Sequence, residues 1–213
     1  MAQVWSVVVA GGSGQRFGTL KQFALLAERP VVAWAVEACR SSSSGVVLVV
    51  PPGMATGAHH GADAVVEGGT TRTESVGRGL AAVPPTADVI IVHDAARPLA
   101  SETLFRGVIA VVTSGGAAGA VPGLPVSDTI KVVDDTQMVT ATLDRATLVA
   151  VQTPQAFAAD VLRQAHTAGA EATDDAALVE AIGGTVRVVP GDPRNLKITT
   201  PADLDRVERL LKG

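Results

Sequence analysis

The sequence predicts an α/β fold in which a mostly parallel β-sheet has helices on both faces and a β-arm protrudes from it. Two observations lead to this prediction. Short valine-rich runs alternate along the chain with segments of helical periodicity, which is typical of a parallel sheet covered on both sides. One later segment alternates β-forming and polar residues around a polar turn, as a hairpin does.

Six runs rich in β-branched residues are predicted as strands. They occupy residues 4–9, 46–50, 64–67, 89–92, 117–121 and 186–189. Helices are predicted at residues 31–40, 71–82, 101–113, 158–168, 174–182 and 201–211. The last helix has the clearest start, because Thr200 is placed to cap it, Pro201 stands in the first turn and Asp203 follows three residues after the cap.

Residues 128–152, DTIKVVDDTQMVTATLDRATLVAVQ, are predicted to form the β-arm, with a polar turn at residues 134–137. An isolated two-stranded ribbon is only marginally stable in water, so the arm is expected to pack on a second copy of the chain. The sequence therefore predicts a homodimer built through this arm. No internal repeat or linker divides the chain, and 213 residues fit one α/β core, so residues 1–213 are expected to form a single domain.

Composition limits the classes of partner. A net charge of -4 and 3% aromatic residues offer neither a basic surface nor a stacking platform for nucleic acid. No apolar run reaches the ~20 residues of a membrane span, and the N-terminus lacks the basic start of a signal peptide, so we expect a soluble cytoplasmic protein without a membrane partner. The single cysteine, Cys39, lies in an apolar helical stretch and is expected to be buried.

The stretch SVVVAGGSGQRFGTLKQ joins an apolar strand to a glycine-rich turn and is typical of a phosphate-binding loop. Gly11, Gly12 and Gly14 remove the side chains that would keep a polyphosphate away from backbone N–H groups. Arg16 and Lys21 supply positive charge beside it. On the loop alone, a tight turn with two surface cations stays open as an alternative.

Two common phosphate loops do not fit this stretch. The dinucleotide fingerprint needs a small residue where Phe17 stands, and no ribose-binding acid follows the second strand. The P-loop pattern needs a hydroxyl residue directly after its lysine, whereas Gln22 follows Lys21. NAD binding and kinase-like P-loop chemistry are therefore not expected.

A second group of polar residues, HDAARP at residues 93–98, directly follows a buried strand. Ligands of open parallel sheets bind beyond the carboxyl ends of the strands, and a carboxylate such as Asp94 facing a phosphate loop there is suited to hold Mg²⁺. The alternative is that Asp94 caps the next helix or pairs with Arg97. His93 is expected to orient this turn. The remaining histidines, at positions 59, 60 and 166, are expected to lie on the surface.

Nine motifs occur along nearly the whole chain in a fixed order: AGGSGQRFG followed by KQF, then EGGTTRTESV, HDAARP, VSDTIK, LDRATL, QTPQAF, TDDAALVE and NLKITTPADL. Together they resemble the 2-C-methyl-D-erythritol 4-phosphate cytidylyltransferases of the non-mevalonate isoprenoid pathway. The resemblance implies a Rossmann-like nucleotidyltransferase fold and a homodimer whose arm lends residues to the neighbouring active site. It also implies that CTP and the alditol phosphate react, with Mg²⁺ as cofactor, to give the CDP-linked alcohol and pyrophosphate.

In such a reaction the substrate's own phosphate attacks the α-phosphorus of CTP, so no protein nucleophile is required. The resemblance implies that Arg16, Lys21 and Lys197 are catalytic cations at the triphosphate and that Asp94 is the metal ligand. It implies nucleotide binding by Ala10, Gly11, Gly12, Gly14, Gly69, Thr70, Arg72, Ser75 and Ala95. It implies binding of methylerythritol phosphate by Thr173 and Lys197 of one chain with Thr129 and Arg145 of the partner's arm.

The chain departs from the family pattern at Thr70, where many members have an acid, and at Arg194, which replaces a residue that is often acidic. Two other functions remain open from the sequence. A sister enzyme that activates D-ribitol 5-phosphate shares most of the motifs. The third possibility is a non-catalytic nucleotide-binding subunit. The presence of Arg16, Lys21, Asp94 and Lys197 argues against it.

Overall fold

The computed structural model describes residues 2–12, 20–57, 59–169 and 171–212. Its centre is an eight-stranded sheet in the order β10-β7-β11-β6-β1-β4-β5, and β12 also pairs with β7. β1, β4, β5 and β6 run parallel to one another, and β12 runs parallel to β7, whereas β10 and β11 are antiparallel to their neighbours. The strands are β1 (Val4–Val9), β4 (Gly45–Val50), β5 (Ala64–Glu67), β6 (Val89–Asp94), β7 (Gly119–Pro125), β10 (Val149–Val151), β11 (Gln155–Ala158) and β12 (Val186–Pro190).

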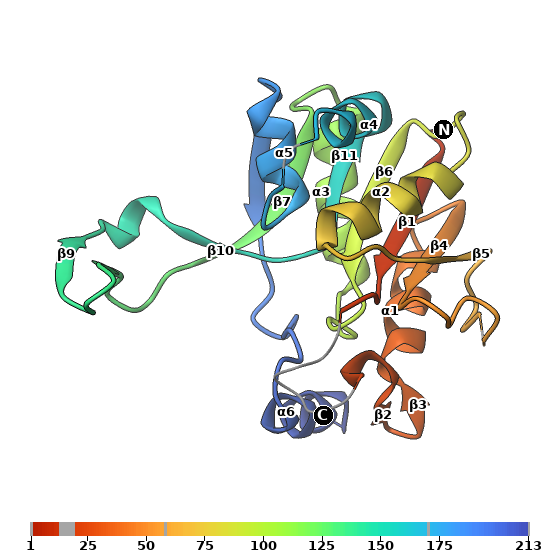
Figure 1. Ribbon diagram of the computed structural model, residues 1–213, viewed down its shortest axis with the longest axis horizontal. Coiled ribbons are helices and arrows are strands. Elements are labelled where there is room, and N and C mark those ends of the chain that lie inside the picture. Colours follow the sequence, from red (N-terminus) through yellow and green to blue (C-terminus); the bar gives the residue numbers. More distant parts are fainter. Residues whose placement is uncertain (1, 13–19, 58, 170, 213) are drawn as a thin grey trace.

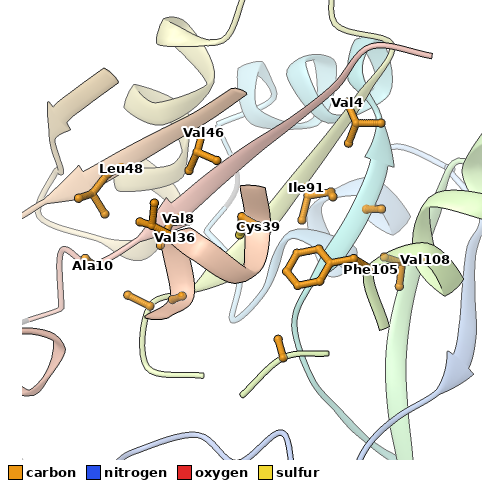
Figure 2. Close-up of a cluster of buried hydrophobic side chains, with 14 of the residues drawn as sticks. Val4, Val8, Ala10, Val36, Cys39, Val46, Leu48, Ile91, Phe105 and Val108 are labelled. Atoms are coloured by element: carbon orange, nitrogen blue, oxygen red, sulfur yellow. The ribbon is translucent and has the colours of Figure 1, made fainter. Parts of the chain in front are cut away.

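Helices cover both faces of the sheet (Figure 1). Alternate side chains of β1 point to opposite faces: Val8 packs in the cluster with α1 and α3, drawn in Figure 2, and Val7 in the cluster with α2, α4 and α5. The prediction of a mostly parallel sheet with helices on both faces is therefore confirmed. The covering helices are α1 (Val31–Arg40), α2 (Arg72–Ala82), α3 (Glu102–Thr113), α4 (Ala159–Thr167) and α5 (Asp175–Ala181).

Cys39 lies in the core between α1 and the sheet (Figure 2) and has no exposed surface. Burial raises the pKa of its thiol to about 12, which outweighs the hydrogen bond with Ser6 that lowers it. The thiol therefore stays protonated at neutral pH and packs as a small apolar side chain.

The C-terminal helix α6 (Pro201–Lys212) begins as the sequence predicts. The Thr200 hydroxyl oxygen accepts a hydrogen bond from the Asp203 N–H at 3.4 Å, and the Asp203 carboxylate accepts one from the Thr200 N–H at 2.8 Å. This reciprocal arrangement is a capping box. Val207 of α6 then packs with Leu26 and Val31 in a separate cluster near the short strands β2 (Leu25–Leu26) and β3 (Arg29–Pro30).

Two parts of the sheet differ from the prediction. The strand predicted at residues 117–121 begins at Gly119 and continues to Pro125, because strands on either side pair with a stretch whose glycines and prolines hide it in the sequence. The sequence also does not predict β11, which lies antiparallel between β6 and β7. Its four residues, QAFA, include no β-branched side chain, so its strand conformation comes from its buried position between two strands.

The predicted hairpin at residues 128–152 is correct only in its middle. β8 (Lys131–Val133) and β9 (Val139–Thr142) pair antiparallel, and the Asp134 carboxylate accepts hydrogen bonds from the N–H groups of Thr136 and Met138 across the turn. The chain then passes through a short 3-10 helix, η2 (Arg145–Thr147), and returns along β7 as β10. Within the arm, β10 therefore belongs to the central sheet, whereas β8 and β9 form a separate two-stranded sheet. The arm projects away from the body of the molecule at the left of Figure 1.

The arm exposes apolar side chains. Met138 is 66% exposed and Val139 is 59% exposed, and Val132, Val133 and Leu143 are each more than 40% exposed. No helix in the described part of the chain is long and apolar enough to cross a membrane.

Candidate active site

A cavity of about 510 Å³ opens where β1 and β6 end. Because parallel strands end at the same edge of a sheet, the segments that follow them meet there. The lining comes from the end of β1 and the glycine turn, the 3-10 helix η1 (Lys21–Phe23), the start of α2, the turn after β6 and the loop before α6. The lining residues are Val9, Ala10, Gly11, Gly12, Lys21, Gln22, Gly69, Thr70, Thr71, Arg72, Ser75, Asp94, Ala96 and Lys197.

Most of the residues singled out in the sequence line this cavity: Ala10, Gly11, Gly12, Lys21, Gly69, Thr70, Arg72, Ser75, Asp94 and Lys197. Ala95 does not, because it turns into the core with 1% of its surface exposed, and Ala96 takes its place in the lining. Thr173 is exposed in the loop before α5 and is not among the lining residues. Gly14 and Arg16 lie outside the described residues.

Thr129 and Arg145 lie on the arm and do not line the cavity of their own chain. Thr129 is exposed just before β8. Arg145 starts the 3-10 helix of the arm, and its guanidinium donates a hydrogen bond to the Ser127 carbonyl. The family resemblance assigns these two residues to the pocket of the partner chain, and within one chain they lie apart from the cavity.

Asp94 is the centre of the charge arrangement in the cavity. Its carboxylate lies 2.6 Å from the Lys197 ammonium and 3.9 Å from the Arg72 guanidinium. Burial by itself would raise the pKa of Asp94, but the positive charges of Lys197 and Arg72 outweigh it and lower the pKa to about 2. Asp94 is therefore a carboxylate at neutral pH. Its ion pair is with Lys197 rather than with Arg97, the partner considered from the sequence.

Lys197 reaches Asp94 because the loop before α6 is fixed to the turn after β6. The Ile198 N–H donates to the Ala96 carbonyl at 2.8 Å, and the Arg97 guanidinium donates to the Asn195 carbonyl at 2.8 Å. The Asn195 side-chain amide, which is fully buried, donates to the Thr153 carbonyl at 2.9 Å. The position of Lys197 over the cavity thus depends on three hydrogen bonds between distant parts of the chain.

His93 orders the turn that carries Asp94. Its Nε2 lies 3.1 Å from the Arg97 carbonyl, which can only accept, so Nε2 carries the proton and Nδ1 accepts from the Thr153 hydroxyl at 3.0 Å. The same hydroxyl oxygen accepts a hydrogen bond from the Asp94 N–H at 3.0 Å. Burial lowers the pKa of His93 to about 4. A neutral, fully buried imidazole in this chain of hydrogen bonds fits the expected orienting role.

The buried His93 makes stability sensitive to mild acid. Its folded pKa, about 4, lies below the unfolded value, so its contribution to stability is present above pH 6.5 and is lost as the pH falls toward 4. Between pH 7 and pH 5 we expect the free energy of unfolding to fall by about 2 kcal/mol on this account. The check is urea unfolding at both pH values for the wild type and for His93→Gln, which does not titrate. An equal pH dependence in the two proteins would contradict this assignment.

Arg72 forms an ion pair with a buried acid, Asp175. Its guanidinium lies 2.7 Å from Asp175, which is fully buried at the start of α5, and the other oxygen of Asp175 lies 2.9 Å from His166 Nε2. The prediction that His166 is an ordinary surface residue is wrong. It stands on the face of α4 that packs on α5, and its side chain is only 6% exposed.

Asp175 was not among the residues picked from the sequence, although the TDDAALVE motif contains it, and Gln22 in the KQF motif was also passed over. The Gln22 side-chain amide is buried and donates to the carbonyls of Ala10 and Gly12 at 2.6 and 3.0 Å. It therefore ties the beginning of the glycine turn to η1. Both residues stand in motifs that the sequence shows, but only the structure shows that their side chains are buried and hold other parts of the site in place.

The loop of residues 68–70, between β5 and α2, has all three of its N–H groups occupied. The Gly68 N–H donates to the Val50 carbonyl at 2.7 Å, the Gly69 N–H to the Ser75 hydroxyl at 3.0 Å and the Thr70 N–H to the Glu74 carboxylate at 2.8 Å. The Gly68 carbonyl accepts a hydrogen bond from Arg78 at 2.9 Å, so the backbone groups that the loop can offer to a ligand are the carbonyl oxygens of Gly69 and Thr70. Thr70, which departs from the family pattern, also donates its hydroxyl to Glu74.

The second departure, Arg194, does not face the cavity. Its guanidinium donates to the Leu210 carbonyl of α6 at 3.1 Å, and its N–H donates to the Asp192 carboxylate at 2.8 Å. A cation near the end of a helix is favourable because the last carbonyl groups carry partial negative charge. In this chain Arg194 fastens α6 to the loop that carries Lys197.

Comparison with known proteins gives a consistent result. The profile of the family described as IspD, 2-C-methyl-D-erythritol 4-phosphate cytidylyltransferase, matches residues 4–213. The 2-C-methyl-D-erythritol 4-phosphate cytidylyltransferase of Desulforamulus reducens is 38% identical, over 100% of this chain and 97% of that protein. The bifunctional enzyme IspD/IspF of Clavibacter michiganensis is 45% identical over 96% of this chain, which spans about half of that longer protein (53%). The crystal structure of 2-C-methyl-D-erythritol 4-phosphate cytidylyltransferase from Thermus thermophilus matches with a TM-score of 0.81 and 34% identity, over 97% of this chain and 98% of that one.

Proposed function

This chain belongs to the 2-C-methyl-D-erythritol 4-phosphate cytidylyltransferase family and transfers CMP from CTP to 2-C-methyl-D-erythritol 4-phosphate in isoprenoid biosynthesis, and we propose that the reaction takes place in the cavity at the ends of β1 and β6. The predicted Rossmann-like nucleotidyltransferase fold is that of its structural relatives. The observation that supports this location is the convergence of Lys21, Arg72 and Lys197 on one cavity beside a glycine-rich turn. Three cations in one pocket suit a triphosphate.

The proposed chemistry is positioning and charge neutralisation. The phosphate of the alditol attacks the α-phosphorus of CTP in line, and pyrophosphate leaves. Lys21 and Lys197, together with Arg16, stabilise the negative charge that spreads over the phosphorus and the leaving group. Lys197 exchanges its contact with Asp94 for the α-phosphate, and the buried Asp175 keeps Arg72 directed into the cavity.

We propose that Asp94 binds Mg²⁺ together with the triphosphate. A magnesium ion needs only one or two carboxylates when phosphate oxygens and water complete its shell, and Asp94 is an ionised carboxylate that lines the cavity. When bound, Mg²⁺ neutralises phosphate charge. The residues present therefore fit this cofactor.

We propose that the loop of residues 68–70 selects cytosine. The 4-amino group of cytosine is a hydrogen-bond donor, whereas uracil presents an acceptor oxygen at the same place. A loop whose N–H groups are all donated within the protein offers acceptors, which suit cytosine and repel uracil. Gly69 and Thr70 both line the cavity.

The activity is tested by pyrophosphate release with CTP and each of two alcohol phosphates, 2-C-methyl-D-erythritol 4-phosphate and D-ribitol 5-phosphate, repeated with ATP, GTP and UTP. We expect turnover with CTP and methylerythritol phosphate. Turnover with ribitol phosphate alone would assign the chain to the sister reaction. CTP binding without turnover would favour a non-catalytic subunit.

We propose that the protein is a homodimer in which the arm of one chain completes the cavity of the other. The exposed apolar residues of the arm, including Met138 and Val139, need a covering surface, and Thr129 and Arg145 lie on the arm rather than at their own cavity. In this arrangement they bind the alditol phosphate of the partner, with Thr173. Both substrates are charged phosphates that do not cross membranes unaided, so we place the enzyme in the cytoplasm.

Subunit complementation tests the shared site. Lys197→Met and Arg145→Ala homodimers should each have little activity, because every site lacks one required cation. After the two are mixed in equal amounts, random exchange of subunits should leave about one site in four with both residues, and activity should return to that level. A mixture that stays inactive although exchange is complete would contradict the shared site. A monomer in light scattering at micromolar concentration would contradict the dimer itself.

A further inference from the structure

The first two turns of α2 hold the loop of residues 68–70 through an ion pair. Glu74 and Arg78 lie one helical turn apart, and their side chains meet at 2.6 Å. Glu74 uses its other oxygen to accept from the Thr70 N–H at 2.8 Å and from the Thr70 hydroxyl at 2.9 Å. Arg78 uses its other nitrogen to donate to the Gly68 carbonyl at 2.9 Å. The ion pair of Glu74 and Arg78, which we call the clamp, therefore holds the loop at both ends.

The loop lies directly against the Glu74 side chain. A Cβ atom added to Gly69 would stand 2.1 Å from Cδ of Glu74, so the backbone approaches the carboxylate more closely than any other residue would allow. The N–H of Glu74 in turn donates to the Thr71 hydroxyl at 3.0 Å, which fixes the start of the helix. Hydrogen bonds from Thr70 and Arg78 lower the pKa of Glu74 to about 2, so the carboxylate is charged at neutral pH.

Two other pairs with the same spacing show that the clamp is particular to α2. Glu102 and Arg106 on α3, and Glu208 and Lys212 on α6, form ion pairs one turn apart on exposed surfaces. Exposed pairs of this kind contribute little to stability. Of these three pairs among the described residues, the pair on α2 is the one that also bonds to the backbone of the loop beside the cavity. We therefore expect it to affect the conformation of the loop more than the stability of the helix.

We propose that Glu74, supported by Arg78, determines the preference of this enzyme for CTP over UTP by keeping the Thr70 N–H occupied. This inference rests on the proposed role of the loop in reading the base. With the clamp closed, uracil would bring its acceptor oxygen against carbonyl oxygens of the loop. With the clamp opened, the Thr70 N–H is released and becomes a donor for uracil. The clamp also orders the loop before the nucleotide arrives, which lowers the cost of binding CTP.

The test compares Glu74→Gln with Glu102→Gln, which makes the same change in an ion pair of the same spacing that does not touch the loop. In Glu74→Gln only one acceptor oxygen remains, and the positively charged Arg78 attracts it, so the amide nitrogen faces the Thr70 N–H as a second donor. The Thr70 N–H is thereby released, and the clamp loses its ion pair. We expect KM for CTP to rise about tenfold, and the ratio of kcat/KM for CTP to that for UTP to fall by about the same factor. We expect kcat and KM for methylerythritol phosphate to stay within about twofold of wild type. Glu102→Gln should match the wild type throughout.

A second variant, Arg78→Met, removes the hydrogen bond to the Gly68 carbonyl but leaves Thr70 bonded to Glu74. Because the loop is held less firmly while the Thr70 N–H stays occupied, the variant should raise KM for CTP but lower the ratio for CTP over UTP by a smaller factor than Glu74→Gln does. Thermal melting of all variants separates loss of the clamp from loss of the fold. The inference is overturned if Glu74→Gln is folded and loses activity equally with CTP and UTP, or keeps the wild-type ratio. A wild-type enzyme that does not use CTP would instead overturn the proposed function, so the two failures are distinguishable.

Discussion

Replacing Lys21 by alanine is expected to lower kcat for CMP transfer by about 10²- to 10³-fold, with the fold intact. Lys21 lines the cavity at the start of η1, and the neighbouring Gln22 ties this short helix to the carbonyls of Ala10 and Gly12. The backbone that carries Lys21 is thereby fixed before the substrate binds. A charge that is held in advance in this way stabilises the transition state without a reorganisation cost. The variant keeps Gln22 and therefore the shape of the glycine turn.

The measurement is pyrophosphate release at saturating CTP and methylerythritol phosphate, with circular dichroism and thermal melting as checks of folding. Lys212→Ala is the matched control, because that lysine is exposed at the end of α6 and pairs with Glu208. The control should retain full activity. Activity of Lys21→Ala near that of the wild type would remove this residue from the catalytic machinery.

Asp94→Asn is expected to lower kcat by at least about 10²-fold and to shift the Mg²⁺ concentration needed for half-maximal activity upward. Asparagine keeps the size of the side chain but removes the negative charge, so the proposed Mg²⁺ site would lose its carboxylate and Lys197 loses its partner at 2.6 Å. Because the pKa of Asp94 is about 2, the wild-type carboxylate is charged throughout the usual assay range.

A Mg²⁺ titration distinguishes the two roles of Asp94. Lys197→Met also breaks the ion pair, but it leaves the carboxylate in place, so it should lower kcat without weakening the response to Mg²⁺. If Asp94→Asn also kept the wild-type titration midpoint and lowered only kcat, Asp94 would serve to position Lys197 and would not be the metal ligand.

The parts of the fold that could be predicted are those whose burial leaves a pattern in the sequence. β1 and β5, with α1, were predicted to the residue, because apolar runs and helical spacing follow directly from one or two buried faces. β11 could not be predicted, since its strand conformation depends on two neighbours that are distant in sequence. β10 could not be predicted for the same reason, since it pairs antiparallel with β7 at the edge of the sheet and does not belong to the hairpin.

The candidate site likewise has residues that the sequence predicts and residues that only the structure identifies. Sequence motifs placed Lys21, Asp94 and Lys197 at one end of the sheet, and the structure brings all three to one cavity. The motifs did not indicate which buried side chains hold the cavity residues in position. His166 and Asp175 meet only because α4 packs on α5, and no local pattern encodes that contact. The contact of Glu74 with the loop of residues 68–70 is likewise visible only in three dimensions.

The contact between Asp94 and Lys197 spans 103 positions of the chain, counted from 94 to 197. During translation the acid leaves the ribosome long before the lysine does, so most of the sheet is available to fold while its carboxylate still lacks this cation. If Lys197 acts as proposed, we expect catalytic competence to be acquired late, when the segment before α6 docks. Limited proteolysis of the segment between β12 and α6 should abolish turnover while circular dichroism still shows a folded sheet. Activity would then report whether this segment has docked.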